Sequence, residues 1–157
     1  LSLLSDESWQ LEVVGSLTAE ASYVKSVRRQ IVKAGLEDQI KLRGLLPDSG
    51  VTESLRRSQV LAVPSFYEGF GIVYLEAMAF GLPVIASVGG AAYELVTNEK
   101  EGFLVSPEDP PALTEPIRTL CQNRDLLIQM SLTAYKHYQH FPTWEQSIAR
   151  IREFLQR

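Results

Sequence analysis

Residues 60–81 decide the fold, and they read VLAVPSFYEGFGIVYLEAMAFG. An apolar run, Val60–Val63, is followed by a glycine-containing turn and then by a longer, mostly apolar run that stops at Gly81. This order predicts a buried strand, a tight loop and a helix. Glu68 and Glu76 bracket the turn, with seven residues between them.

The turn and the helix after it create a site for an anion. Backbone N–H groups at the start of a helix have no partner within the helix, and the helix dipole makes that end positive. Glycine lets a phosphate approach the backbone without a Cβ in the way. An ionised carboxylate can only accept hydrogen bonds, and sugar hydroxyls can donate them. Two glutamates beside a phosphate site therefore indicate a sugar nucleotide as the ligand.

The rest of the chain repeats the alternation of short apolar runs with helical patterns. We expect strands at residues 11–15, 40–44, 60–64, 83–87 and 102–105. Helices are expected between them, including two at about 71–80 and 91–97. The pattern predicts an α/β fold, Rossmann-like, with a doubly wound parallel sheet and helices on both faces. Ligands bind beyond the carboxyl ends of parallel strands, which is where the Glu68 loop lies.

Helix boundaries follow from capping residues. Thr18 is expected to open the first long helix and Gly35 to close it. Asp109, which precedes two prolines, marks another helix start. Pro116 removes a backbone donor and predicts a kink or a later start in that helix. After Pro142, the side chains on one face of a final helix are Trp144, Ile148, Ile151, Phe154 and Leu155.

Size, charge and cysteine content limit the functional classes. The 157 residues suffice for one domain with a core, and the net charge of -4 argues against general nucleic-acid binding. The single cysteine cannot form an intramolecular disulfide, and no apolar run approaches the roughly 20 residues of a membrane span. We expect a cytoplasmic location, with peripheral contact at a membrane face as an alternative. We interpret as a solvated helix face the basic residues Lys25, Arg28, Arg29 and Lys33.

Residues 60–84 resemble the donor-binding motif of the retaining glycosyltransferases with the GT-B fold, most closely glycosyltransferase family 4. That family's signature is two glutamates separated by seven residues, with E-G-F-G at the front and E-A-M-A-x-G-x-P-V at the back. Both halves are present here, at residues 68–71 and 76–84. An E-G-F-G tetrapeptide alone is weak evidence, but the match extends over nearly the whole chain, through residues 11–15, 40–44, 87–90, 94 and 102–105.

The resemblance implies roles for particular residues. Glu68, the expected catalytic residue, contacts the hydroxyls of the transferred sugar, and Glu76 holds the ribose. The residues expected to bind substrate are Gly69, Phe70, Gly71, Ile72, Glu76 and Leu46. The first four bind the diphosphate around the turn, and the loop with Leu46 meets the nucleobase. The implied reaction transfers a hexose from a nucleotide-diphosphate sugar to a hydroxyl acceptor with retained anomeric configuration, and it needs neither a metal nor another cofactor.

Less specific interpretations fit the same residues. A strand-to-helix turn uses glycines without any ligand, and a lone glutamate is usually solvated. Glu76, however, lies in a mostly apolar helix, where a solvated face is hard to supply. A retaining glycosidase pair needs carboxyl groups about 5–5.5 Å apart, whereas Glu76 lies roughly 7.5 Å along a helix axis from Gly71. Gly89 and Gly90 fit a second helix start at the pocket and a purely structural turn equally well.

One family feature is missing from these residues. Members carry an Arg and a Lys that neutralise the diphosphate, on a first strand and loop that would precede Leu1. We therefore expect residues 1–157 to be the C-terminal, nucleotide-sugar-binding domain of such an enzyme, without its first strand and without the N-terminal domain that binds the acceptor. Alone, this chain is expected to transfer no sugar at a useful rate. His137 and His140 share a helix face without a third ligand, and we interpret them as surface residues.

Two rival functions keep the fold. One is a non-catalytic nucleotide-binding or regulatory module, and the other is a different reaction of the same fold, such as that of a sugar-nucleotide epimerase or a phosphorylase. An Arg and a Lys on a strand and loop upstream of residue 1 would favour transfer, and their absence would favour the binding module.

Overall fold

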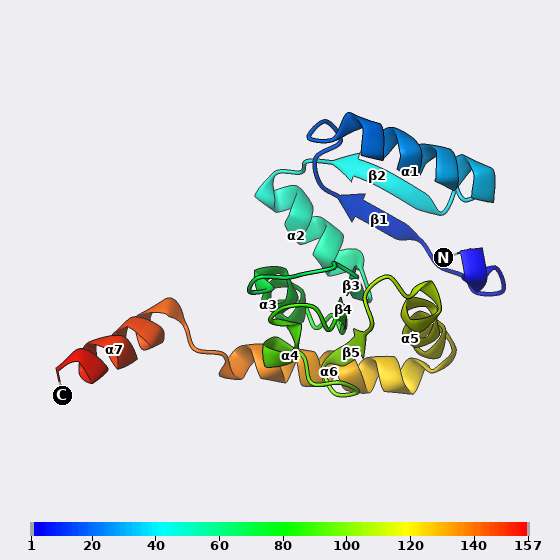
Figure 1. Ribbon diagram of the computed structural model, residues 1–157. Coiled ribbons are helices and arrows are strands. Elements are labelled where there is room, and N and C mark those ends of the chain that lie inside the picture. Colours follow the sequence, from blue (N-terminus) through cyan, green and yellow to red (C-terminus); the bar gives the residue numbers. More distant parts are fainter. Residues whose placement is uncertain (1, 157) are drawn as a thin grey trace.

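The computed structural model describes residues 2–156, and strands alternate with helices until the chain becomes wholly helical (Figure 1). In chain order the elements are η1 (a 3-10 helix, Ser2–Leu4), β1 (Leu11–Val14), α1 (Ala21–Ala34), β2 (Ile40–Gly44), α2 (Asp48–Arg57), β3 (Leu61–Val63), α3 (Ile72–Ala79), β4 (Val84–Ser87), α4 (Ala92–Leu95), β5 (Gly102–Val105), α5 (Pro110–Gln122), α6 (Arg124–His140) and α7 (Trp144–Leu155). The five expected strands are confirmed, each within one residue of the expected boundaries.

The strands form two separate parallel sheets. β1 pairs with β2, whereas β4 lies between β3 and β5. The doubly wound α/β class with helices on both faces is confirmed, but the sequence predicts one sheet and the structure has two. We call residues 11–44 the N-terminal unit and residues 61–105 the C-terminal unit.

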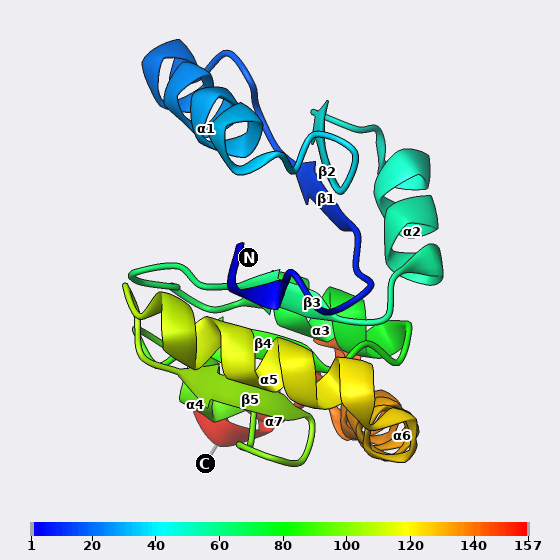
Figure 2. The same cartoon turned by 90° about the vertical axis from the view of Figure 1, so that its right-hand side faces the viewer.

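The core of the molecule lies around the C-terminal unit. Every residue of β4 is buried, so this strand is covered on both faces. Val84 and Ala86 belong to one apolar cluster with α3 and α4, whereas Ile85, which points to the opposite face, belongs to a second cluster with α5 and α6. Figure 2 shows α5 and α3 on opposite sides of this sheet.

The N-terminal unit has no comparable core. No residue from 5 to 53 is buried, although the strands are apolar and α1 has an apolar stripe. α1 ends as expected at Gly35, whose positive φ of 66° lets its N–H bond back to the last turn. The expected start at Thr18 is wrong. The helix begins at Ala21, because the amide of Thr18 donates to Ser16 Oγ (3.3 Å) in a turn that precedes the helix.

A charged cluster joins the N-terminal unit to α2. The Glu12 carboxylate in β1 accepts hydrogen bonds from Arg57 (2.6 and 2.7 Å) and from Ser54 Oγ (3.1 Å), and it forms an ion pair with Arg43 (3.0 Å). The hydrogen bonds from the Arg57 guanidinium lower the pKa of Glu12 most, and the bond from the Ser54 hydroxyl lowers it further. Desolvation of the carboxylate opposes them, and the pKa of Glu12 stays below its usual value of 4.5. These bonds position α2 against β1.

The helices after β5 differ from the expectations in one respect. Asp109 caps α5 as predicted, since its carboxylate accepts a hydrogen bond from the Ala112 amide (3.0 Å). Of the two alternatives predicted for Pro116, the later start is wrong, because α5 begins at Pro110 and continues through Pro116, and the kink stays a prediction. The ring of Pro116 is buried, and this burial offsets the missing backbone hydrogen bond.

The C-terminal helix α7 extends away from the rest of the molecule (Figure 1). Thr143 and Gln146 form a capping box at its start. Its predicted apolar face is exposed over its whole length, through Trp144, Ile148, Ile151, Phe154 and Leu155. Within residues 2–156, no helix combines the length and the apolar character that crossing a membrane requires. The predicted solvated face of α1 is confirmed, because its members are all exposed, namely Lys25, Arg28, Arg29 and Lys33.

Candidate functional site

The loop 64–71 connects the carboxyl end of β3 to the amino end of α3, as the sequence predicts. Gly71 is the N-cap of α3 and has a φ of 79°, in the left-handed region. A Cβ at this position would lie 2.4 Å from the ring of Tyr74, so only glycine fits. The local conformation that exposes the first amides of α3 therefore depends on this residue.

Glu68 is held in place by its backbone and by its side chain. Its N–H donates to Gly89 O (3.2 Å), and its carbonyl accepts from the Ala91 amide (3.0 Å). Its carboxylate accepts a hydrogen bond from the Gly71 amide (3.2 Å), which closes the turn ahead of α3. The Glu68 side chain is half-buried and points to the helix start, so that a negative charge lies at the positive end of the helix.

The segment 89–90 lies directly against the Glu68 loop. A Cβ on Gly89 would lie 2.0 Å from Phe66 O, and one on Gly90 would lie 2.0 Å from Glu68 O. The Ser87 hydroxyl, at the end of β4, donates a further hydrogen bond to Ser65 O. Both glycines thus have the structural role that the sequence left open, since they let two backbones approach each other. The α4 helix that follows them is only one turn long.

The expected diphosphate-binding amides lie together on the turn, and one of them is already bonded. The Gly71 amide donates to Glu68, whereas the amides of Gly69 and Phe70 have no hydrogen-bond partner within residues 2–156. The side chains of Phe70 and Ile72 are exposed beside them. An anion at the turn would meet these amides and those of the first turn of α3.

Glu76 lies on the exposed face of α3. This face comprises Ile72, Glu76 and Phe80, which follow one another at intervals of four residues, whereas Tyr74, Leu75, Ala77 and Met78 are buried. The expectation that a solvated face is hard to supply in this helix is therefore wrong. The apolar neighbours of Glu76 in sequence point into the core, and the carboxylate points out of it. Glu76 lies one turn beyond Ile72, roughly 6 Å along the helix.

Tyr74 is a residue of this site that sequence reasoning missed. Its side chain is fully buried next to the turn, and its hydroxyl is the one buried side-chain polar atom without a hydrogen-bond partner among residues 2–156. Burial, and secondarily the negative charge of Glu68, raise the pKa of Tyr74. Its place in a run of apolar residues predicts burial but gives no signal of the unpaired hydroxyl.

Leu46 belongs to the other sheet. It lies in the loop 45–47 between β2 and α2, half-buried against Gly50. The loop follows the carboxyl end of a parallel strand, as does the Glu68 loop. Leu46 and Glu68 are nevertheless carried by different sheets.

Comparison with known protein families decides the assignment. A family model described as "Glycosyl transferases group 1" matches residues 1–137. The chain belongs to this family.

Two curated proteins illustrate its place among the group 1 glycosyltransferases. The chain is 35% identical over 130 residues to the lipopolysaccharide core biosynthesis mannosyltransferase LpcC of Rhizobium leguminosarum bv. viciae, covering 82% of this chain and 36% of that protein. It is 29% identical over 146 residues to the D-inositol 3-phosphate glycosyltransferase of Corynebacterium glutamicum, covering 93% of this chain and 35% of that protein. The chain therefore spans about a third of the length of these relatives.

Solved structures of glycosyltransferases have the same fold. Anabaena Alr3699/HepE in complex with UDP and glucose matches with a TM-score of 0.84 and 31% identity, over 94% of this chain and 40% of that one. The C-terminal domain of the group 1 family protein LpcC from Francisella tularensis matches with a TM-score of 0.79 and 26% identity, over 88% of this chain and 73% of that one. The resemblance to a GT-B C-terminal domain is thus confirmed.

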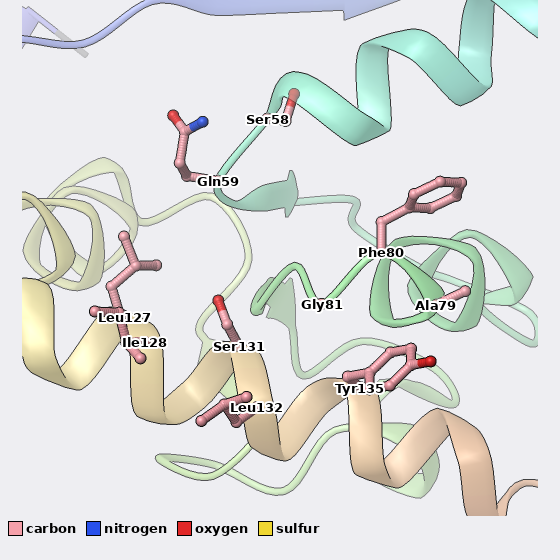
Figure 3. A pocket seen from close by; sticks show the side chains of 10 residues that line it. All are labelled: Ser58, Gln59, Ala79, Phe80, Gly81, Leu127, Ile128, Ser131, Leu132 and Tyr135. Carbon is pink, nitrogen blue, oxygen red and sulfur yellow. The ribbon is translucent and has the colours of Figure 1, made fainter.

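A cavity elsewhere on this glycosyltransferase domain is distinct from the Glu68 loop. It has a volume of about 460 Å³ and lies where the residues before β3 and the end of α3 approach α6 (Figure 3). Its lining residues are Ser58, Gln59, Ala79, Phe80, Gly81, Leu127, Ile128, Ser131, Leu132 and Tyr135. Ligands of doubly wound sheets bind beyond the carboxyl ends of the strands, whereas this cavity lies at the amino end of β3.

The two histidines differ in their surroundings. His140 is exposed as expected, but His137 is half-buried, and its Nδ1 lies 3.4 Å from the buried Glu101 carboxylate. His137 thus lies at the surface as expected, but it is partly covered and lies beside a carboxylate. No cluster of three or more His, Cys, Asp or Glu residues that could hold a metal ion occurs in the described part of the chain.

Proposed function

We propose that this chain is the donor-binding domain of a retaining glycosyltransferase that transfers a hexose from a nucleotide-diphosphate sugar to a hydroxyl acceptor. The observation that carries the proposal is the Glu68 carboxylate at the amino end of α3, beyond the carboxyl end of β3. The matched relative LpcC is a mannosyltransferase, and the matched structure of HepE has been solved with UDP-glucose. The first supports transfer of a hexose, and the second supports a nucleotide sugar as the donor.

The geometry supports a division of roles along the site. The amides of Gly69, Phe70, Gly71 and Ile72 would bind the diphosphate, and Glu68 would orient the sugar that is transferred. Because Glu76 lies on the same helix, one turn further from the loop, it suits the hydroxyls of the ribose. The backbone at Leu46 would meet the nucleobase from the other sheet.

The negative charge of the site supports the proposal that basic residues outside this chain help to bind the diphosphate. Between Arg57 and Lys100 the sequence has no Lys, Arg or His, but it has Glu68, Glu76 and others. Amides and a helix dipole can stabilise the departing phosphate charge, and a diphosphate beside carboxylates also calls for cations. We propose that an Arg and a Lys from the preceding part of the protein neutralise it. An N-terminal domain would bind the hydroxyl acceptor, so that the 157-residue chain alone is inactive.

No metal or other cofactor is part of the proposed mechanism, because backbone amides and basic side chains take over the stabilisation of charge. No side chain of this chain is assigned as a nucleophile. We place the protein in the cytoplasm, with peripheral membrane contact if the acceptor is a lipid.

The first experiment tests the binding site on the isolated chain. We expect UDP, GDP and ADP, titrated separately and followed by NMR, to shift the amide signals of residues 65–76. Without the basic pair, the affinity should be no better than roughly millimolar, about -4 kcal/mol. Shifts confined to the cavity of Figure 3 would contradict the assignment.

The second experiment tests the proposed catalytic residue in the full-length protein. Glu68→Gln keeps the shape of the side chain and removes its charge. It should leave the affinity for the free nucleoside diphosphate nearly unchanged and lower kcat by at least about tenfold, equivalent to about 1.4 kcal/mol. The matched control is Glu115→Gln, at an exposed position on α5. Unchanged turnover in Glu68→Gln would reject the role.

The third experiment separates Glu76 from Glu68. Glu76→Ala removes charge-assisted hydrogen bonds to the ribose, so it should weaken donor binding by about 1.5–3 kcal/mol. The variant should lose most of its preference for a ribose donor over a deoxyribose donor. If the full-length protein turned over no nucleotide sugar at all, a non-catalytic nucleotide-binding module would become the better conclusion.

A further inference from the structure

We propose that two copies of this chain associate through the outer face of α6, as an antiparallel pair of helices related by a two-fold axis near Ser131 and Leu132. Each copy would present the same surface to the other. α6 carries none of the residues of the proposed donor site, so this inference stands independently of the proposed function. Three observations support it: an exposed apolar seam, a groove beside the seam, and flanking charges that complement one another when the second helix is reversed.

The outer face of α6 carries an apolar seam, formed by Ile128, Leu132 and Tyr135. Ile128 and Leu132 are each 58% exposed, and Tyr135 is 43% exposed. They follow one another at intervals of four and three residues, so they lie along one stripe of the helix. The opposite side of α6 already packs on the core, where Met130 and Ala134 belong to the two apolar clusters. A helix that covers a core needs only one apolar side, so the seam is available for a second contact.

A groove runs beside this seam (Figure 3). It is the cavity of about 460 Å³ between α6 and the end of α3, with Phe80 and Gly81 on one side and the seam on the other. Phe80 is 40% exposed, so the apolar surface continues across the groove onto α3. Helices pack by placing the side chains of one helix into the grooves of another. This surface has both parts, which suits it to contact with a copy of itself.

Reversing the second helix brings unlike residues of the seam together. With a two-fold axis near residue 131, Ile128 of one copy faces Tyr135 of the other, because the two positions lie at about equal distances on either side of the axis. Leu132 lies almost on the axis, where it would enter the groove of the second copy beside Ser131. The large side chains are thus distributed around the axis rather than stacked upon themselves.

The charged residues that flank the seam favour the same arrangement. Asp125 and Lys136 are exposed, and within residues 2–156 neither of them forms an ion pair. They lie on one side of the seam, eleven positions or about three turns of helix apart. An antiparallel pair brings Asp125 of each copy near Lys136 of the other, whereas a parallel pair would place like charges together. Arg124 and the exposed Tyr138, on the groove side, are related in the same way and favour a cation–π contact.

A second copy fits this surface better than a membrane does. Helices that lie on membranes carry mainly Lys and Arg on their polar side. The outer face of α6 instead has both signs of charge, at the positions that an antiparallel pair would match. The seam and Phe80 form a small patch, and small interfaces are weak, so we expect a Kd of roughly 10–100 µM.

Analytical ultracentrifugation of the full-length protein tests the proposal. The wild type should change from monomer to dimer between about 5 and 300 µM. Leu132→Glu places a charge at the centre of the interface in both copies, so it should weaken the dimer at least about 30-fold and stay monomeric at about 300 µM. The matched control is Ile151→Glu, on the exposed face of α7, which should dimerise as the wild type does.

Three outcomes of this experiment would overturn the proposal. They are a wild type that stays monomeric at about 300 µM, a dimer that survives Leu132→Glu, and a dimer that Ile151→Glu abolishes. The last would place the contact on α7. Because all these positions are exposed, thermal melts of the variants should match the wild type and show that each one is folded.

Charge reversal tests the antiparallel arrangement of the two helices. Asp125→Lys puts like charges opposite each other in both symmetric contacts, so it should weaken the dimer by about tenfold, and Lys136→Asp should do the same. Combining the two substitutions restores unlike pairs, and the double variant should return to within about threefold of the wild-type Kd. A double variant as weak as the single ones would reject the antiparallel pairing, as would an Asp125→Lys dimer as tight as the wild type.

Discussion

The N-terminal and C-terminal units have the same pattern in sequence and very different interiors. Both alternate apolar strands with helices, and all their strands are parallel. In the C-terminal unit β4 lies between two strands, and Val84 is fully buried. In the N-terminal unit, β1 pairs only with β2 among the strands of residues 2–156, and Val13 remains 40% exposed. Apolar side chains make the burial of a strand favourable, but the neighbouring strand and the covering helices decide whether it is buried.

The difference also separates two kinds of stabilisation. The C-terminal unit is held by apolar clusters on both faces of β4 and by close backbone contacts. The N-terminal unit is joined to the rest through the hydrogen bonds and ion pairs of Glu12. Burial of apolar area contributes roughly 25 cal/mol per Å², whereas exposed ion pairs contribute about 0–1 kcal/mol each. Mutations in the two units should therefore have unequal effects.

The largest difference is expected for two glycines. A Cβ on Gly102 would lie 1.8 Å from Val84 O, so Gly102→Ala should force β4 and β5 apart and cost at least about 3 kcal/mol of unfolding free energy. Gly15→Ala meets no atom within 4 Å and should change stability by less than about 1 kcal/mol. Urea denaturation measures both. Equal losses would show that the N-terminal unit is packed as tightly as the C-terminal one.

A smaller difference is expected for two isoleucines. Ile85 is fully buried in β4, so Ile85→Ala should lower the free energy of unfolding by about 2–5 kcal/mol. Ile31→Ala, on the half-buried stripe of α1, should lower it by about 1 kcal/mol or less. Both are measured from the midpoints of urea denaturation. A cost as large as that of Ile85→Ala would mean that the unit is buried in solution.

The Glu12 cluster gives the N-terminal unit a dependence on pH. The pKa of Glu12 is lowered in the folded state. The hydrogen bonds of its carboxylate therefore stabilise the protein fully above about pH 4.5, and this stabilisation is lost as the pH falls through the lowered pKa of the folded state. Glu12→Gln should cost about 1–2 kcal/mol at pH 7, and the difference from wild type should be smaller at pH 3. Thermal melts at the two pH values measure this. A constant difference at both would show that packing, rather than charge, accounts for the loss.

The smallest effect is expected for two tyrosines. The Tyr74 hydroxyl is buried without a partner among residues 2–156, so Tyr74→Phe should be neutral or stabilise the protein by up to about 1 kcal/mol. Tyr23→Phe, on the exposed surface of α1, should change stability by less than about 0.5 kcal/mol. Chemical denaturation of the matched pair is the measurement. Clear destabilisation by Tyr74→Phe would reveal a bonded hydroxyl.

Sequence patterns predicted the local structure well where one physical cause dominates. The strand ends, the glycine at the end of α1 and the Asp109 cap follow from apolar runs, from positive φ and from side-chain capping. The helix start predicted at Thr18 is wrong, because the amide of Thr18 donates a hydrogen bond to Ser16 Oγ in a separate turn. The later helix start predicted at Pro116 is wrong, because α5 continues through this residue and buries its ring. A neighbouring hydroxyl decided the outcome at Thr18, and burial in the tertiary structure decided it at Pro116.

The candidate site shows the same limit. Glu68, the glycine turn and the start of α3 could be recognised from residue types and spacing alone, because the chemistry of a strand-loop-helix turn is local. The exposure of Glu76 could not be predicted from the sequence, since it depends on which face of α3 meets the core. The close approach of Gly89 and Gly90 to residues 66–68 could not be predicted either, because the two segments are more than 20 positions apart in the sequence.

By itself, the sequence determined the α/β class, the order of the elements, the membership of a glycosyltransferase family and the place of the Glu68 loop, because these depend on periodicity and on motifs of adjacent residues. Only the tertiary structure decided that the strands form two sheets, that the core lies around β4 and that Glu68 caps the turn before α3. The physical reason is that pairing and burial are properties of neighbours in space. A strand carries the same apolar residues whether or not its neighbour is present.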